Sequence, residues 1–543
     1  MLGSQLVIQA LARRGVRTIF SLSGNQIMPL YDACIDAGIR IVHVRHEAAA
    51  VFMADAWSQV TGEIGVALLT AGPGITNGVA PLYSAAQAES PVLLLSGDSP
   101  LGEDGMGAFQ EMDQAAITRP LTKLSRRVDL PAALATAVDE AITLALAPRR
   151  GPVHLALPFD LLREKAGITA LPALPADAKP PQAIADDVVT LAALFAHARH
   201  PIVLGGASAA RASARATWRA IEAGLHAPVL ALESPRGLRD PSLGAFAEAR
   251  AQADLVVLAG KRLDFAVGFC RTSAFGADAR IVVLDPDPAM LDRAARLLGN
   301  RLALACRCEP ADTLMRVVRT REMPTRDDWL AQVFAAVASR TLEAAPDAPP
   351  GKLAPRALCD AVQRFLATAR DPILVCDGGE FGQWAQAFCS APVRIVNGTS
   401  GAIGGGICYA LAAKIARPGA TVVALMGDGT SGFHFMELDT AVRENAPFIA
   451  VIGNDLRWNA EHMIQVRTYG VDRLIGCGLA PSARYHDAAR ALGGFGAAVS
   501  RVDELDGALH AAAAIGLPAC INVALDGQPA PAFVGAAKVT ASH

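Results

Sequence analysis

Short runs of apolar residues alternate along the chain with longer stretches in which apolar and polar positions follow helical spacing. In the first third, the apolar runs lie at 16–20, 41–44, 65–70 and 91–95, and the segment at 46–59 has the pattern of a helix. Strands that are apolar without alternation are buried on both faces, as in parallel sheets whose crossover connections are helices. The pattern therefore predicts an α/β fold built on parallel sheets.

The same pattern recurs in two further parts of the chain, each of which follows a proline-rich stretch. Residues from about 167 to 184 and from about 345 to 355 are rich in Pro and Ala, a composition typical of interdomain linkers. We predict three doubly wound parallel-sheet domains, at 1–166, 185–330 and 352–526. The strands expected in the second and third domains lie at 201–204, 255–259, 281–284, 373–376, 394–396, 421–426 and 448–452.

Size and charge narrow the possible classes of function. A chain of 543 residues exceeds what one hydrophobic core supports, which agrees with several domains. The net charge of −3 provides no basic surface for nucleic acid, and no apolar run approaches the roughly 20 residues that span a bilayer. The N-terminus has the pattern of an amphipathic helix and not of a signal peptide. The ten cysteines are scattered through apolar segments, as reduced thiols are in a cytoplasmic protein.

Two acidic turns follow predicted strands of the third domain. The strand at 421–426 runs into the sequence GDGT at 427–430, and the strand at 448–452 runs into GND at 453–455. Ligands bind at the carboxyl ends of strands in open α/β sheets. Asp428 and Asp455 can offer there the hard oxygen atoms with which Mg²⁺ is bound beside phosphates, and the glycines let the backbone approach a phosphate closely. Either turn alone would be an ordinary βα turn, but the two together favour a metal–diphosphate site.

These turns resemble the motif of the thiamine diphosphate-dependent decarboxylase and carboligase family, which begins with GDG and ends with an Asn-rich turn. Asp455 stands at the interval from Asp428 that this motif has. The resemblance implies thiamine diphosphate as the cofactor, with Mg²⁺ bound by Asp428, Asp455 and the backbone carbonyl of Arg457. Most members have Asn where this chain has Asp455, and Asn454 is the alternative ligand if the register differs by one.

A second resemblance to the family lies in the first domain, where the sequence VRHE at 44–47 continues a predicted strand. By this resemblance, Glu47 binds the pyrimidine nitrogen of the cofactor and promotes removal of the C2 proton, chemistry in which the protein supplies orientation and electrostatics. We expect an apolar pocket around its carboxylate. The alternative is that Glu47 merely complements the dipole of the helix that it begins.

Other segments match the family over nearly the whole chain. The resemblance implies cofactor contacts from Asn25, Gly379, Glu380, Gly401, Ile403, Gly427, Gly429 and Thr430. Ile403 matches the bulky apolar residue that holds the cofactor bent, which brings its reacting atoms together. Gln110, in an FQE segment at 109–111, matches a position that orients a substrate carbonyl, and an ordinary surface glutamine is the alternative.

The resemblance also bears on assembly and activity. In the family the sites form between subunits, which implies a homodimer with inter-subunit active sites, and a homotetramer is common. We expect an acetolactate synthase-like carboligase that acts on 2-oxoacids. The alternatives are a 2-hydroxyacyl-CoA lyase and a non-catalytic protein that binds a cofactor or nucleotide on this fold. The sequence has no adjacent His pair of the kind that releases an aldehyde, which favours carboligation or lyase chemistry over simple decarboxylation.

The second domain bears on a further cofactor. Residues 233–265 lack the Met- and Gly-rich loop of flavin-binding acetolactate synthases, so FAD is not expected. Asp285, at the end of a predicted strand, could hold a ribose of ADP or CoA, as acidic residues do in Rossmann-like folds. A nucleotide fold that binds nothing is the alternative. The residues after Asp526 include a single Lys and so offer no basic clamp for the phosphates of CoA.

Overall fold

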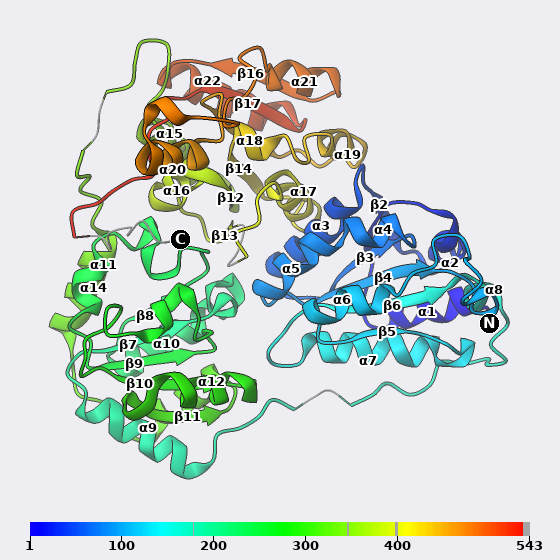
Figure 1. Cartoon of the computed structure of the whole chain (residues 1–543), viewed down its shortest axis with the longest axis horizontal. Coiled ribbons are helices and arrows are strands. Elements are labelled where there is room, and N and C mark those ends of the chain that lie inside the picture. Colours follow the sequence, from blue (N-terminus) through cyan, green and yellow to red (C-terminus); the bar gives the residue numbers. More distant parts are fainter. Residues whose placement is uncertain (177–178, 345–346, 397–399, 536–543) are drawn as a thin grey trace.

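The computed structural model describes residues 1–176, 179–344, 347–396 and 400–535. It has three α/β bodies, each built around its own sheet, and neighbouring strands are parallel in all three sheets (Figure 1). The predicted α/β class with three parallel sheets is therefore confirmed. The domain boundaries at 1–166, 185–330 and 352–526 stay predictions.

The N-terminal body is blue and cyan in Figure 1, and its strand order is β2-β1-β3-β4-β6-β5. Because its strands are apolar on both faces, a separate hydrophobic cluster flanks each face of the sheet. The strands are β1 (Thr18–Ser21), β2 (Arg40–His43), β3 (Gly65–Leu69), β4 (Val92–Asp98), β5 (Ser125–Arg127) and β6 (Val153–Pro158). The helices are α1 (Gly3–Arg13), α2 (Met28–Ala37), α3 (Glu47–Thr61), α4 (Pro73–Asn77), α5 (Val79–Gln87), α6 (Gln114–Thr118), α7 (Leu134–Leu146) and α8 (Phe159–Arg163).

The central body, green in Figure 1, has a five-stranded sheet in the order β11-β10-β9-β7-β8, with a hydrophobic cluster on each face. Its strands are β7 (Pro201–Gly205), β8 (Val229–Ala231), β9 (Leu255–Ala259), β10 (Arg280–Asp285) and β11 (Leu302–Arg307). Its helices are α9 (Ala185–His197), α10 (Arg215–Leu225), α11 (Phe246–Arg250), α12 (Pro288–Leu298), α13 (Pro310–Thr320) and α14 (Asp327–Ala338).

The C-terminal body, yellow to red in Figure 1, has the strand order β13-β12-β14-β15-β17-β16. Counted along the chain, this is the same order as in the N-terminal sheet. Its strands are β12 (Pro372–Asp377), β13 (Val393–Val396), β14 (Thr421–Gly427), β15 (Ile449–Asn454), β16 (Phe495–Val499) and β17 (Ala519–Ala524). Its helices are α15 (Pro355–Thr368), α16 (Gly379–Phe388), α17 (Gly406–Ala416), α18 (Asp428–Ser431), α19 (Glu437–Arg443), α20 (Asn459–Tyr469), α21 (Tyr485–Ala491) and α22 (Val502–Ile515).

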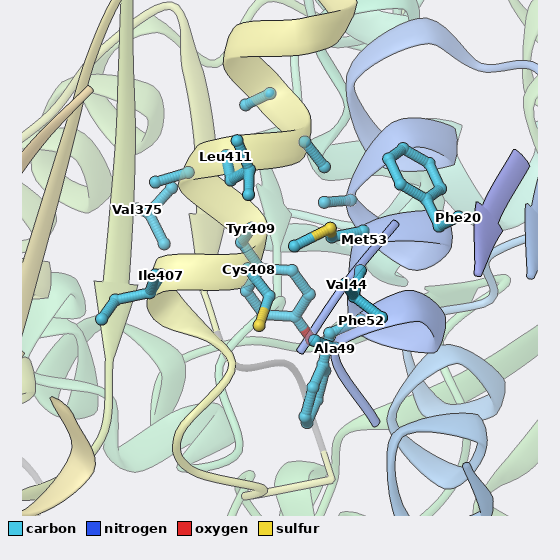
Figure 2. Packing of buried hydrophobic residues seen from close by; sticks show 14 of the residues in the cluster. Phe20, Val44, Ala49, Phe52, Met53, Val375, Ile407, Cys408, Tyr409 and Leu411 are labelled. Atoms are coloured by element: carbon cyan, nitrogen blue, oxygen red, sulfur yellow. The ribbon is translucent and has the colours of Figure 1, made fainter. Parts of the chain in front are cut away.

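The N-terminal and C-terminal bodies meet through α3 and α17, whose side chains form one shared core (Figure 2). Both helices are apolar nearly all round, as buried helices are. Phe52 of α3 packs edge-on against Tyr409 of α17, with ring centroids 5.5 Å apart. The hydroxyl of Tyr409 donates a 3.1 Å hydrogen bond to the buried carboxylate of Asp55. This core fixes the two bodies against each other.

Two further features concern membrane-spanning helices and the state of the cysteines. No helix within the described ranges is both long enough and apolar enough to cross a bilayer. All ten cysteines are buried as free thiols, where they act as small apolar side chains.

Candidate active site

A cavity of about 430 Å³ opens at the edge of the C-terminal sheet where β12, β14 and β15 end. This is the edge at which open parallel sheets bind ligands. Its lining includes Gly379, Glu380, Gly401, Ile403, Gly427, Asp428, Gly429, Thr430, Asp455 and Arg457. The structure thus brings together every site residue that the sequence predicted for this part of the chain.

Two carboxylates dominate the electrostatics of the cavity. Asp428 and Asp455 are only 2% and 7% exposed. Burial raises the pKa of Asp428 to about 6. Burial, followed by repulsion from Asp428, raises the pKa of Asp455 to about 7, and the nearby Arg457 opposes this only in part. Two buried acids that disfavour each other's charge form a site where a cation is strongly favoured.

The donor set suits a hard divalent ion. Backbone amides already donate to both oxygens of Asp428, from Gly429 at 3.0 Å and from Leu456 at 2.8 Å, which fixes the direction of its remaining lone pairs. Within the described residues no group of three or more His, Cys, Asp and Glu side chains surrounds a metal position. Two carboxylates completed by a backbone carbonyl and by phosphate oxygens match the coordination of Mg²⁺.

The turn after β15 is held in an unusual conformation. Leu456 has φ of +65°, a region that branched residues rarely adopt and that persists only where the surroundings enforce it. The hydrogen bond from its amide to Asp428 is one such constraint. Asp455 lines the cavity, whereas the side chain of Asn454 donates to Asn522 of β17 at 3.1 Å.

At two glycines of the cavity wall, a side chain would not fit. A Cβ atom on Gly429 would come within 2.7 Å of the ring of Trp458, and one on Gly378 would lie 3.0 Å from Ile403. Gly379 begins α16, and the free amides at such a helix start attract a phosphate. The arrangement can therefore cradle a diphosphate beside the two acids.

Asp377 holds the loop that carries Ile403. It is fully buried at the end of β12 and accepts hydrogen bonds from the amides of Gly404, at 3.0 Å, and Gly406, at 2.8 Å. From the other side, His434 Nδ1 lies 2.7 Å from the carbonyl oxygen of Gly404. Ile403 is thus fixed at the cavity wall. Residues 397–399, which precede this loop, lie outside the described ranges.

The site residues predicted for the N-terminal body form a second group. Glu47 begins α3, is half-buried, and accepts a 3.0 Å hydrogen bond from Asn77. Gln110, in a left-handed conformation with φ of +61°, accepts a 2.8 Å hydrogen bond from Gln26. Asn25 is exposed at the start of a short 3-10 helix.

Within one chain these two groups of residues stay apart. None of Glu47, Gln110 and Asn25 lines the cavity of the C-terminal body. The apolar pocket expected around Glu47 is accordingly not formed by its own chain, in which Glu47 keeps contact with solvent.

Three further residues have a place at these sites that was not predicted from the sequence. Gln26 is buried, whereas the preceding Asn25 is exposed. Besides donating to Gln110, its side chain accepts a 2.7 Å hydrogen bond from Thr70. Trp458 lines the cavity beside Arg457. Arg236 reaches the cavity from the central body, and its guanidinium makes no hydrogen bond to any residue that the structure describes. The available signal was their position in the sequence: Gln26 follows Asn25, Trp458 follows Arg457, and Arg236 lies within the loop at 233–238.

A basic cavity lies where the central body meets the N-terminal body. Asp285 is fully buried, ion-paired with Arg149, and accepts a 2.9 Å hydrogen bond from the amide of Asp287. Its carboxylate is thus engaged within the protein and is not free for the ribose that the sequence suggested. Beside it lies a cavity of about 460 Å³ whose lining includes five basic side chains, namely Lys123, Arg149, Arg150, Arg262 and Arg307.

Two family models match the outer two bodies. The thiamine pyrophosphate enzyme N-terminal TPP binding domain matches residues 1–117, and the C-terminal TPP binding domain of the same enzymes matches residues 377–523. Fold, cavity and matches together define a thiamine pyrophosphate enzyme.

Relatives extend this similarity to the whole chain. It is 34% identical to the acetolactate synthase large subunit of Mycobacterium tuberculosis, over 97% of this chain and 96% of that one. It is 32% identical to 2-hydroxyacyl-CoA lyase 2 of Bos taurus and 30% identical to that of Homo sapiens, each over 92% of this chain and 86% of the relative. The chain belongs to the thiamine pyrophosphate enzyme family and is an enzyme that depends on thiamine diphosphate.

Proposed function

We propose that the enzyme is a Mg²⁺-dependent carboligase that decarboxylates a 2-oxoacid and joins the remaining fragment to a second carbonyl compound, like the acetolactate synthases to which it is similar. The observation that carries the proposal is the pair of buried acids, Asp428 and Asp455, in one cavity at adjacent strand ends. When bound, thiamine diphosphate supplies the carbon nucleophile and accepts the electrons of the broken bond.

Each group of residues has a distinct task in this proposal. Asp428, Asp455 and the carbonyl of Arg457 hold Mg²⁺, with Asn454 as the alternative ligand. The backbone of Gly379, Glu380, Gly427, Gly429 and Thr430 binds the diphosphate, and Gly401 and Ile403 support the bent cofactor. Glu47 holds a proton at the pyrimidine nitrogen, Asn25 contacts the cofactor from the same body, and Gln110 orients the substrate carbonyl.

Arg236 favours a substrate that carries a carboxylate. Its side chain is half-buried, and burial lowers its pKa while Glu380 and Asp240 oppose that shift. A half-buried guanidinium that no described residue accepts a hydrogen bond from is strongly stabilised by a bidentate carboxylate. A 2-oxoacid offers such a group.

The proposal requires a homodimer, in which a partner chain brings its Glu47 to the cavity. Two observations support this assembly. Glu47 does not line the cavity of its own chain, and large apolar side chains are exposed near both groups of site residues, with Met106 76% and Ile475 81% exposed. A partner chain that covers both groups of site residues would also cover these side chains. Two dimers can pair further into a tetramer.

A second candidate function is a 2-hydroxyacyl-CoA lyase, which would yield formyl-CoA and an aldehyde. The basic cavity beside Asp285 favours it, because cations in its lining suit the phosphates of CoA or ADP. Arg149 is already ion-paired with Glu89 and Asp285, and Lys123 donates to backbone carbonyls, so Arg150, Arg262 and Arg307 would carry most of this binding. FAD is not part of either proposal.

Product analysis by mass spectrometry separates the two functions. The enzyme is incubated with thiamine diphosphate and Mg²⁺, with pyruvate in one reaction and a 2-hydroxyacyl-CoA in another. Acetolactate from pyruvate alone supports the carboligase, and formyl-CoA with an aldehyde from the second reaction supports the lyase. Turnover of neither substrate would contradict both, and a reaction in a chelator controls for the metal.

The role of Glu47 is tested by Glu47→Gln, which keeps the shape of the side chain but cannot hold the proton in the same way. We expect the rate of deuterium exchange at C2 of the bound cofactor to fall by about 100-fold or more, since general acid–base groups contribute about this much. Asn77→Ala is the matched control, because it removes only a support of that carboxylate and should have a smaller effect. Unchanged exchange in Glu47→Gln would disprove the assignment.

A further inference from the structure

The turn that precedes Glu47 is held by the C-terminal body of the same chain. Glu437, the first residue of α19, is only 1% exposed. One of its carboxylate oxygens accepts hydrogen bonds from the backbone amides of Arg45, at 2.9 Å, and His46, at 3.2 Å. Its other oxygen accepts from the Thr440 hydroxyl at 2.6 Å. A buried carboxylate with both oxygens engaged defines the position of this turn closely.

The side chain of His46 links that turn to the helix that Glu47 begins. Its Nδ1 accepts a 3.1 Å hydrogen bond from the amide of Ala48 and so caps α3. Its ring lies edge-on to His434, with centroids 5.8 Å apart. Because Glu47 directly follows His46, any displacement of the turn displaces the carboxylate of Glu47.

The residues that hold this turn belong to a segment that also builds the cavity of its own chain. The segment begins at Asp428 in α18 and continues through His434 to Glu437. His434 contacts His46 on one side and the carbonyl of Gly404, next to Ile403, on the other. One short stretch of backbone therefore contacts both groups of site residues.

We propose that Glu437 is a positioning residue that fixes Glu47 of its own chain for use in the partner's cavity. This inference rests on the proposed function, in which Glu47 acts on a cofactor bound by the other chain. Each C-terminal body then has two tasks: it binds one cofactor, and it orients the glutamate that activates the other one. The two active sites of a dimer are coupled through Glu437.

The first test compares three variants of the full enzyme with thiamine diphosphate and Mg²⁺ bound. Glu437→Ala removes the acceptor for both amides and should slow deuterium exchange at C2 of the cofactor by about 10- to 100-fold, the usual effect of a misplacement near 1 Å. Cofactor affinity should change by less than about threefold, because no group at the partner's diphosphate site is altered. Glu437→Gln retains an acceptor oxygen and should restore most of the rate.

Glu444→Ala is the matched control. Glu444 also joins the two bodies, through an ion pair in which the Nε of Arg40 donates to it at 3.1 Å, but it does not touch the turn before Glu47. If Glu437 acted only by holding the bodies together, both alanine variants would slow exchange alike, and that result would overturn the proposal. Should Glu437→Ala fail to fold, Glu437→Asp keeps the charge but withdraws the acceptor, and it should slow exchange as well.

Glu47→Gln separates this inference from the proposed function. If Glu47→Gln slows exchange and Glu437→Ala does not, only the positioning role is wrong. If neither variant slows exchange, the proposed role of Glu47 is wrong and the positioning role is overturned with it.

Mixed dimers test which cavity Glu437 serves. Asp428→Ala inactivates the cavity of its own chain. When Asp428→Ala and Glu437→Ala lie on different chains of one dimer, one complete site remains and about half of the activity should persist. When both changes lie on the same chain, neither site is complete and activity should fall to the level of Glu437→Ala or below. The opposite pattern would show that Glu437 serves its own cavity and would overturn the coupling.

Discussion

Asp455 is the residue at which this chain departs from the motif of most family members, and the structure shows the electrostatic consequence. A second buried carboxylate now lies near Asp428, and its pKa rises to about 7 in part through their repulsion. A divalent ion between the two acids would relieve this repulsion, so that the site has a stronger preference for a cation than a site with one acid and one amide.

Substitutions of Asp428 and Asp455 should therefore have unequal effects on the retention of the cofactor. Asp428→Ala removes a carboxylate that also accepts two backbone amides, and we expect the Mg²⁺-dependent retention of cofactor to fall by about 100-fold. Asp455→Asn restores the common form of the motif and should retain cofactor within about tenfold. Cofactor that stays with the protein after gel filtration, with and without a chelator, measures both. Full retention by Asp428→Ala in a chelator would contradict the metal assignment.

Asp377, which holds the loop that carries Ile403, should make the stability of the fold depend on pH. Burial raises the pKa of Asp377 from its ordinary value of 3.8 to about 6, and the amides of Gly406 and Gly404 oppose this. Because the folded pKa lies above the unfolded one, protonated Asp377 contributes stability that is fully present below the unfolded pKa and is lost as the pH rises through about 6.

Asp377→Asn keeps an acceptor oxygen but does not ionise. The free energy of unfolding of this variant, relative to that of the parent, should therefore rise by up to about 3 kcal/mol between pH 4 and pH 8. Chemical denaturation of the ligand-free protein at both pH values measures this difference. A difference that does not change with pH would show that the fold does not oppose ionisation of Asp377.

At the level of single residues, the sequence predicted the acids at strand ends because strand ends and glycine turns are visible in the pattern. It pointed to Asn25, whereas the buried contacts at that turn are made by the next residue, Gln26. Which of two adjacent polar residues faces inward depends on the short 3-10 helix at 25–27, and hydrophobic spacing carries no information on so short an element.

At the level of elements, the predicted strands are present, and six further strands were not predicted. Four of them, β5, β8, β11 and β16, lie at the edges of their sheets, and β5 and β8 are only three residues long, too short to stand out as apolar runs. Two others, β6 and β17, are interior but contain His154 and Asn522. These polar residues interrupt the apolar run and find partners in Ser96, at 2.9 Å, and in Asn454.

The packing of α3 on α17 gives a prediction at the same scale. Tyr409→Phe removes the hydrogen bond to Asp55, whose carboxylate is fully buried, and should lower the free energy of unfolding by about 1–3 kcal/mol. The control is Tyr31→Phe, which removes a hydrogen bond to the neutral Ser21 and should cost about 1 kcal/mol or less. Chemical denaturation measures both, and equal losses would show that the charge of Asp55 is not important here.

At the scale of the whole molecule, the proposed function makes activity depend on assembly, because the two groups of site residues lie apart within one chain. Specific activity should fall when the enzyme is diluted below the dissociation constant of the dimer, and it should return on reconcentration. Activity measured beside sedimentation velocity over the same concentrations tests this. A monomer with full activity would contradict an inter-subunit site. The family resemblance implied this separation, whereas composition and hydrophobic spacing could not have shown it, because it arises from how the folded bodies face one another.

The common strand order of the N-terminal and C-terminal sheets makes their elements comparable one by one. In both sheets the helix at the shared core follows the second strand, so α3 and α17 are equivalent elements of one topology. Their contact therefore joins topologically equivalent helices of the two bodies. The loop before α3 ends at Glu47 and the equivalent loop before α17 carries Ile403. In the proposed function, the same position of one topology thus has two different tasks: one loop presents an acid that handles a proton, and the other presents an apolar support for the same cofactor.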